Sequence, residues 1–169
     1  MKKLLCALLM IATVFALTAC GIFVKSPEIE EGRFNFSVTY ECDGEIKTVS
    51  GVYVCEYAGA SWSIEGGGFS RDWDYHYEGV EAGGGGQIHV ATIDDGGKIY
   101  ISLGFYPQYF MDDPEIGELT PPEPIVYIEY ANEDDDMASS FGDEEMIAEL
   151  YGIKIISYQY DDPIENTFG

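Results

Sequence analysis

Basic residues, histidine and cysteine are all scarce in this chain of 169 residues. Only eight residues are lysine or arginine, against 31 aspartates and glutamates. Nucleic acid is therefore excluded as an expected partner, because its binding depends on lysine and arginine neutralising phosphates. The two histidines cannot build a zinc site without carboxylates, and no H-E-x-x-H or paired C-x-x-C pattern occurs. The sequence indicates no cofactor.

Long apolar runs are also lacking, apart from one at the start. Met1–Lys3 is basic, and Leu4–Ala19 is free of charged residues, which is the layout of an export signal. The run has roughly 16 residues, fewer than the ~20 that a helix needs to cross a bilayer. Ordinary signal cleavage prefers small residues at positions −3 and −1, and a cut before Cys20 would place Leu17 at −3.

The tetrapeptide Leu17-Thr18-Ala19-Cys20 resembles the lipobox of bacterial lipoproteins, a similarity that covers only the first 20 residues. The resemblance implies a signal peptide over residues 1–19, cleavage before Cys20, and a diacylglycerol thioether on Cys20. Two acyl chains give stable anchoring, whereas one is marginal. We therefore expect a lipid-anchored protein on the extracytoplasmic side of a cell membrane. Ordinary secretion and an uncleaved helix are the alternatives.

The remainder of the chain has the size of a single domain. Residues 20–32 are polar and contain Pro27 and three glutamates, which indicates a lipid anchor followed by a short tether. Residues 33–169 are enough for one hydrophobic core. Their acidity indicates a soluble surface, or an affinity for cations and basic partners. Anionic membrane surfaces should repel such a domain, so the lipid must hold it.

Two strands and their turn are predicted close to the start of this domain. Arg33–Cys42 alternates apolar and polar residues, as a half-buried strand does, and Ile46–Tyr57 follows as its antiparallel partner. Asp43-Gly44 between them is a strong hairpin signal. That hairpin would separate Cys42 from Cys55 by roughly 33 Å at ~3.3 Å per residue, too far for a disulfide. An exported cysteine pair otherwise favours a disulfide, so either the turn or the bridge must be absent.

The pattern further along predicts short strands and a single helix. Four prolines in residues 105–123 exclude a helix or a central strand there. The expected elements are a short strand at Ser61–Glu65, a hairpin of Gln87–Ile93 with Lys98–Gly104, a central strand at Pro124–Ala131, a helix at Asp143–Tyr151 and a last strand at Ile153–Tyr160. We therefore predict a mostly β fold, an immunoglobulin-like antiparallel β-sandwich of six to eight strands with one short α-helix before the last strand.

Residues 66–86 give the best indication of a binding surface. Two glycine clusters flank an aromatic segment, which predicts a long surface loop with at most one short edge strand. Trp73, Tyr75 and Tyr77 would lie on one face if the segment is extended, and exposed rings suit binding. The alternative is an edge strand that folds back onto the sandwich, with Trp73 filling the core.

Evidence for other chemistry is weaker. Asp134, Asp135 and Asp136 offer oxygen ligands for Ca²⁺, but their spacing does not match an EF-hand loop. Any of the many acids could be nominated for glycoside hydrolysis, so that pattern carries no information. We predict a non-catalytic binding or structural module, with an envelope glycan or protein as partner. A Ca²⁺-dependent binder and a glycan-acting enzyme are the alternatives. In organisation alone, the domain is similar to small lipoproteins of Gram-positive bacteria.

Overall fold

Strand β1 (Glu31–Cys42) carries the alternation that the sequence predicts. Phe34, Phe36 and Val38 are buried, and the residues between them face outward. The strand pairs on one side with β2 (Glu45–Ser63) and on the other with β8 (Lys154–Tyr160), both antiparallel. β1 is therefore a central strand, which explains why its inner face is continuously apolar.

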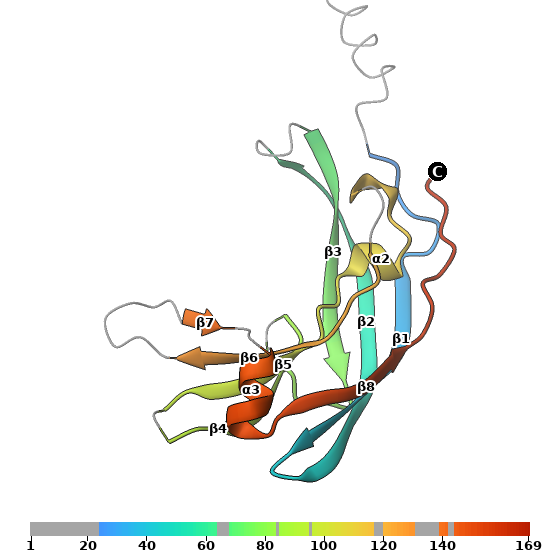
Figure 1. The fold of residues 1–169 in the computed structure, drawn as a ribbon. Helices are drawn as coiled ribbons and strands as arrows, with labels where there is room; N and C mark the ends of the chain where they lie inside the picture. The colour runs from blue at the N-terminus through green and yellow to red at the C-terminus, as the bar shows by residue number, and fades with distance from the viewer. Residues whose placement is uncertain are drawn as a thin grey trace, which may run out of the picture.

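The computed structural model describes residues 24–63, 68–83, 85–94, 96–116, 120–130, 139–141 and 144–169. Within them, two four-stranded sheets are formed, and Figure 1 shows the strands of the second running across those of the first. The first has the order β3-β2-β1-β8, where β3 is Gly68–Glu78. The second has the order β4-β5-β6-β7, with the bounds Gln87–Thr92, Lys98–Ser102, Ile125–Tyr130 and Ser139–Phe141.

The chain is thus an antiparallel β-sandwich with helix α3 (Glu144–Tyr151) before the last strand, which confirms the predicted fold class. The first three strands lie in the first sheet and the next four in the second, and β8 then returns to pair with β1. An immunoglobulin domain instead exchanges strands between its sheets. The connectivity here is therefore simpler than the one expected from the sequence.

The predicted first hairpin is confirmed, and the cysteines are free. Asp43 and Gly44 have φ values of 55° and 75°, as a two-residue hairpin turn requires. Cys42 pairs with Glu45 beside this turn, whereas Cys55 lies opposite Gly32 near the start of β1. Both thiols are buried and unbonded to each other, so the hairpin was the correct alternative to a disulfide.

Three segments differ from the prediction. The short strand expected at Ser61–Glu65 is the end of β2, which continues to Ser63. The expected loop at residues 66–86 contains the eleven-residue strand β3. Residues 105–123 include a one-turn helix, α2 (Pro107–Phe110), and a 3₁₀ turn, η1 (Pro114–Ile116). Proline is tolerated at a first helical position because no backbone N–H is needed there.

Aromatic side chains fill the space between the sheets. Phe110 from α2 lies 4.7 Å from Phe34 and 5.3 Å from Tyr53, measured between ring centroids. Phe105 lies 5.1 Å from Phe110 and 5.6 Å from Tyr160. These tilted and edge-on contacts are the geometry that aromatic pairs prefer. The proline-rich segment thereby supplies two central residues of the core.

The residues before β1 are already part of the fold. Glu28 N donates to Thr167 O over 2.7 Å, and Gly169 N donates to Ser26 O over 3.1 Å. The side chain of Asn166 bonds both backbone groups of Ile29. The folded part therefore begins before residue 33, whereas the sequence analysis placed the start of the domain at residue 33.

Candidate functional site

The predicted binding residue Trp73 lies in the core. Its side chain is only 9% exposed, and its ring packs edge-on to Tyr57 with 5.5 Å between the centroids. The indole Nε1 donates a hydrogen bond of 2.8 Å to Asp113 Oδ2. Trp73 is therefore unavailable to a ligand on the surface.

Tyr75 and Tyr77 share the face of Trp73, as predicted, but this is the inner face of β3. Tyr77 is half-buried, and burial raises the pKa of its hydroxyl. Tyr75 alone is exposed, at 41%. The prediction of an exposed three-ring surface is therefore wrong, and the alternative with an edge strand and Trp73 in the core is correct. The reason is the long pairing of β3 with β2, in which Trp73, Tyr75 and Tyr77 lie opposite Tyr57, Cys55 and Tyr53.

A buried ion pair beside Trp73 was missed by sequence reasoning. Arg71 Nε lies 2.9 Å from Asp113 Oδ2, and Arg71 Nη2 lies 2.7 Å from Asp113 Oδ1. Glu115 N donates to Asp113 Oδ1, and Arg71 Nη1 donates to Lys25 O. The guanidinium also lies 4.2 Å from the ring centroid of Phe168. One cluster thus joins β3, the α2–η1 segment and both terminal segments.

The charges and hydrogen bonds of this cluster fit a structural role. Burial acts to raise the pKa of Asp113, but the hydrogen bonds from Arg71, Trp73 and the Glu115 backbone outweigh it, so the pKa is lowered. Both partners are therefore charged at neutral pH. Because both carboxylate oxygens of Asp113 are occupied by protein donors, the group is not poised to exchange a proton with a substrate.

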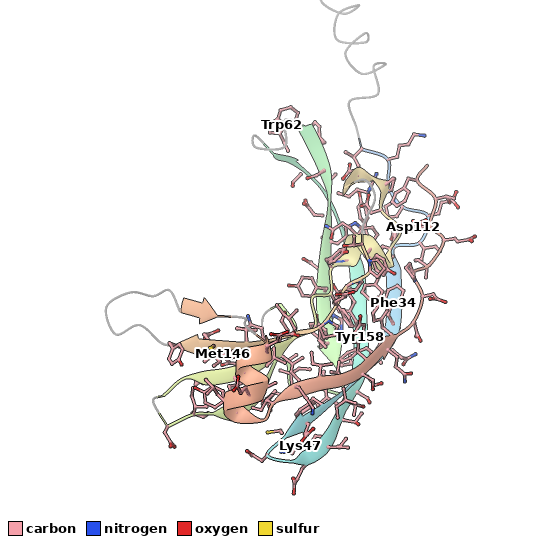
Figure 2. The ribbon with its side chains drawn as sticks, in the orientation of Figure 1. Phe34, Lys47, Trp62, Asp112, Met146 and Tyr158 are labelled. Atoms are coloured by element: carbon pink, nitrogen blue, oxygen red, sulfur yellow. The ribbon has the colours of Figure 1, made fainter. Side chains whose placement is uncertain are left out.

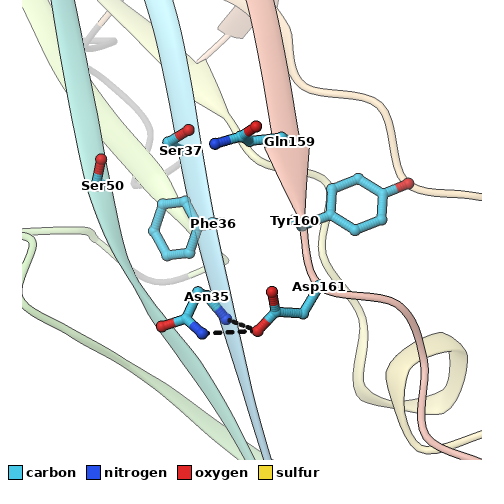
Figure 3. A pocket seen from close by; sticks show the side chains of 7 residues that line it. All are labelled: Asn35, Phe36, Ser37, Ser50, Gln159, Tyr160 and Asp161. Carbon is cyan, nitrogen blue, oxygen red and sulfur yellow. Dashed lines mark hydrogen bonds between the residues drawn. The ribbon is translucent and has the colours of Figure 1, made fainter.

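An open groove of about 380 Å³ on the outer face of the first sheet is the best candidate for ligand contact. Ser37 of β1 lies directly opposite Ser50 of β2 on one side and Gln159 of β8 on the other. These three side chains form a polar row across the sheet, and Asn35 and Asp161 lie at one end of it (Figure 3). The alternation of the strands explains the row, since the buried residues between these positions point inward.

The groove presents hydrogen-bonding groups and no exposed aromatic ring. Asp161 Oδ2 accepts from Asn35 N at 2.8 Å and from Asn35 Nδ2 at 2.7 Å, which fixes both side chains. Phe36 is 3% exposed, and the ring of Tyr160 points away from the groove and contacts Phe105 in the core (Figure 3). The arrangement therefore suits a ligand with many donors and acceptors, held without ring stacking.

Two other predicted sites lie outside the described residues: the lipid-bearing Cys20, and the weak metal candidates Asp134, Asp135 and Asp136. Among the residues that are described, no group of three or more histidine, cysteine or acidic side chains could hold a metal ion. None of the helices described is long and apolar enough to span a membrane.

Comparison with protein-family models, with curated proteins and with solved structures finds no match to this chain.

Proposed function

We propose that the protein is a bacterial lipoprotein, held on the extracytoplasmic side of a membrane by acyl chains on Cys20, whose β-sandwich is a non-catalytic binding module. The observation that carries the proposal is the motif Leu17-Thr18-Ala19-Cys20 at the end of an uncharged run. The fold supports it, because hydrogen bonding to the domain begins at Lys25 and Ser26, only a few residues after the proposed anchor. A domain so close to its lipid works at the membrane surface.

The outer groove is the proposed contact surface, and a glycan of the cell envelope is the proposed ligand class. Hydroxyl, amide and carboxylate groups line the groove, through Ser37, Ser50, Gln159, Asn35 and Asp161, and these groups match the hydroxyls and amides of a sugar chain. The strong acidity of the chain favours neutral or amine-bearing glycans over anionic ones. Both carboxylate oxygens of Asp113 accept hydrogen bonds from protein donors, which leaves the Arg71–Asp113 pair a structural role.

Lipid attachment is tested by expressing the full chain with its own leader in bacteria fed a labelled fatty acid. We expect the wild-type protein and Cys6→Ser to carry label, and Cys20→Ser to carry none. Cys6 is the matched control because it lies within the predicted signal peptide. Intact mass should show a chain that begins at Cys20 with diacylglycerol added. An unmodified mature protein released into the medium would contradict the proposal.

Ligand binding is tested with the same protein on an array of neutral and amine-bearing envelope glycans. Gln159→Ala and Ser50→Ala should each weaken binding by about 2- to 10-fold, as expected for the loss of one hydrogen bond. Ser157→Ala is the control, because it lies on the same strand, opposite Thr39, one row outside the groove. Equal affinity in all variants, or no binding to any glycan, would contradict the groove as the contact surface.

A further inference from the structure

Strands β2 and β3 extend beyond the rest of the first sheet. The first residue of β1, Glu31, pairs with Glu56 of β2. Beyond Tyr57, β2 pairs only with β3 among the described strands, so these two strands form a projecting ribbon (Figure 1). A two-stranded ribbon has little core of its own, and Trp62 near its end lies outside the buried core.

The end of the ribbon carries an aromatic pair, of which Trp62 is exposed and Phe69 is half-buried. Trp62 lies opposite Phe69, with ring centroids 5.1 Å apart and planes at 76°. Trp62 is 57% exposed. Figure 2 shows it at one end of the first sheet, with Lys47 at the other end. Residues 57–71, which form the ribbon and its connection, contain a single acid, Glu65, whereas the chain as a whole has 31.

The segment before β1 runs along this ribbon toward its end. Tyr57 N donates to Glu30 O over 2.8 Å, and Arg71 Nη1 donates to Lys25 O over 2.9 Å. Arg71 pairs with Ala60, and Trp62 pairs with Phe69 two positions further out, a distance of ~7 Å along a strand. Followed toward residue 24, the chain thus approaches the aromatic pair.

The length of chain before Val24 limits how far the domain can lie from its anchor. Val24 lies four positions after Cys20, and a fully extended chain spans at most ~3.6 Å per position, or ~14 Å in total. A bilayer that holds acyl chains on Cys20 must therefore lie close to the ribbon.

We infer that the Trp62–Phe69 pair contacts the headgroup region of the bilayer that holds the lipid of Cys20, so that anchor and ribbon together orient the domain. The inference rests on the proposed function, since it requires a lipidated Cys20. Tryptophan suits this position because its ring is apolar and its N–H prefers a wet environment. The pair is a second point of contact, and a domain with two contacts cannot tumble about its tether.

Charge favours the same orientation. The acid-poor end of the ribbon faces the bilayer, and the hairpin at Asp43 and Gly44, near Lys47, faces away (Figure 2). Repulsion between carboxylates and anionic headgroups falls off within a Debye length, ~8 Å at physiological salt. Standing the domain on this end therefore places fewer carboxylates near the headgroups than standing it on the hairpin, which carries Glu41, Asp43 and Glu45.

The test uses the lipidated full-length protein, purified from membranes and placed in phosphatidylcholine vesicles with and without bromine on the upper part of the acyl chains. The chain has two tryptophans, and Trp73 is buried while Trp62 is exposed. We expect brominated lipid to quench the Trp62 component of the fluorescence, and Trp62→Phe to lose that quenched component. The control is Trp62→Phe with Ile46→Trp, because Ile46 is 71% exposed beside the opposite hairpin. Its new tryptophan should stay unquenched.

The outcomes separate the inference from the proposed function. If intact mass shows no lipid on Cys20, the proposed function fails. If Cys20 is lipidated but brominated lipid leaves Trp62 unquenched, the inference fails while the anchor stands. Equal quenching of tryptophan at positions 62 and 46 would also overturn the inference, because it would mean that the domain has no fixed orientation.

Discussion

Arg71 and Asp113, which lie 42 positions apart in the chain, face each other as a two-point ion pair inside the protein. Their side chains are 5% and 1% exposed. The same arginine bonds Lys25 O near the amino terminus. The pair therefore couples the position of β3 to that of the segment leading toward Cys20, which makes it central to stability.

Asp113→Ala should destabilise the fold strongly. The change removes the acceptor of Arg71 and of Trp73 Nε1 and leaves the buried guanidinium with only the more distant carboxylate of Glu115, 3.8 Å away. Breaking a buried ion pair in this way costs ~3–5 kcal/mol. Urea unfolding followed by circular dichroism measures the loss. Arg33→Ala is the control, because Arg33 pairs with Glu78 at the surface, with side chains 49% and 44% exposed, and exposed ion pairs contribute little to stability. Equal losses in the two variants would contradict the structural role of the buried pair.

The contribution of Asp113 should depend on pH in a defined direction. Its pKa is lowered in the folded state, so its stabilisation is fully present above the unfolded pKa of ~4 and is lost as the pH falls through the folded pKa. The difference in unfolding free energy between wild type and Asp113→Asn should be constant from about pH 7 to 5 and should shrink below about pH 4. A difference that grows at acid pH would reverse the assigned shift. Taking the difference in unfolding free energy between wild type and Asp113→Asn cancels the contribution of the other carboxylates, which titrate in both proteins.

The two cysteines of the domain should be unreactive in the native state. Burial raises the pKa of Cys55 to about 12 and also raises that of Cys42, so almost no thiolate is present at neutral pH. Iodoacetamide at pH 7.5 should modify neither residue until denaturant is added. Non-reducing peptide mapping should find no link between them. Rapid modification of either thiol without denaturant would contradict the burial of these positions.

Gly86→Ala should cost more stability than Gly85→Ala. Both glycines have positive φ, 77° at Gly85 and 76° at Gly86, so alanine is strained at either position by ~1–3 kcal/mol. A Cβ at Gly86 would also collide with the hydroxyl of Tyr77, whereas a Cβ at Gly85 meets nothing within 4 Å. The collision should add ~1–3 kcal/mol, measured by thermal unfolding.

A double-mutant cycle separates the collision from the backbone strain. Among the described residues, the Tyr77 hydroxyl has no hydrogen-bond partner, so Tyr77→Phe should cost little by itself. In the Tyr77→Phe background, Gly86→Ala should lose part of its extra cost while Gly85→Ala keeps its full cost. Unchanged costs for both would show that the ring does not crowd Gly86.

Local patterns in the sequence predicted the elements whose neighbours are close in the chain. The alternation around Phe34 and Phe36 identified β1, and Asp43-Gly44 identified its turn. The helix ending before Gly152 was visible from its acidic first turn and its closing glycine. In each case, the residues that decide the structure lie within a few positions of one another.

The remaining features depend on partners far along the chain. The inner face of β3 carries Arg71 in line with Trp73, so the strand lacks the apolar alternation by which strands are recognised. Arginine is compatible with that face only because Asp113 lies there, and no local signal links the two. The groove is hidden for the same reason, since Asn35 meets Asp161 across 126 positions. The polar residues of β1 indicated which face of the strand points outward. They did not indicate that residues of β8 lie beside them on that face.

The return of β8 to the side of β1 has a consequence for biogenesis. A chain synthesised from its amino terminus forms the β1–β2–β3 meander from neighbouring segments, but β8 is made only after all four strands of the second sheet. Until it arrives, one edge of β1 is open, and an open edge can pair with a second nascent chain. Closing so long a loop is also slow. The time taken for the carboxyl-terminal strand to dock therefore sets how long each new molecule is at risk of aggregation.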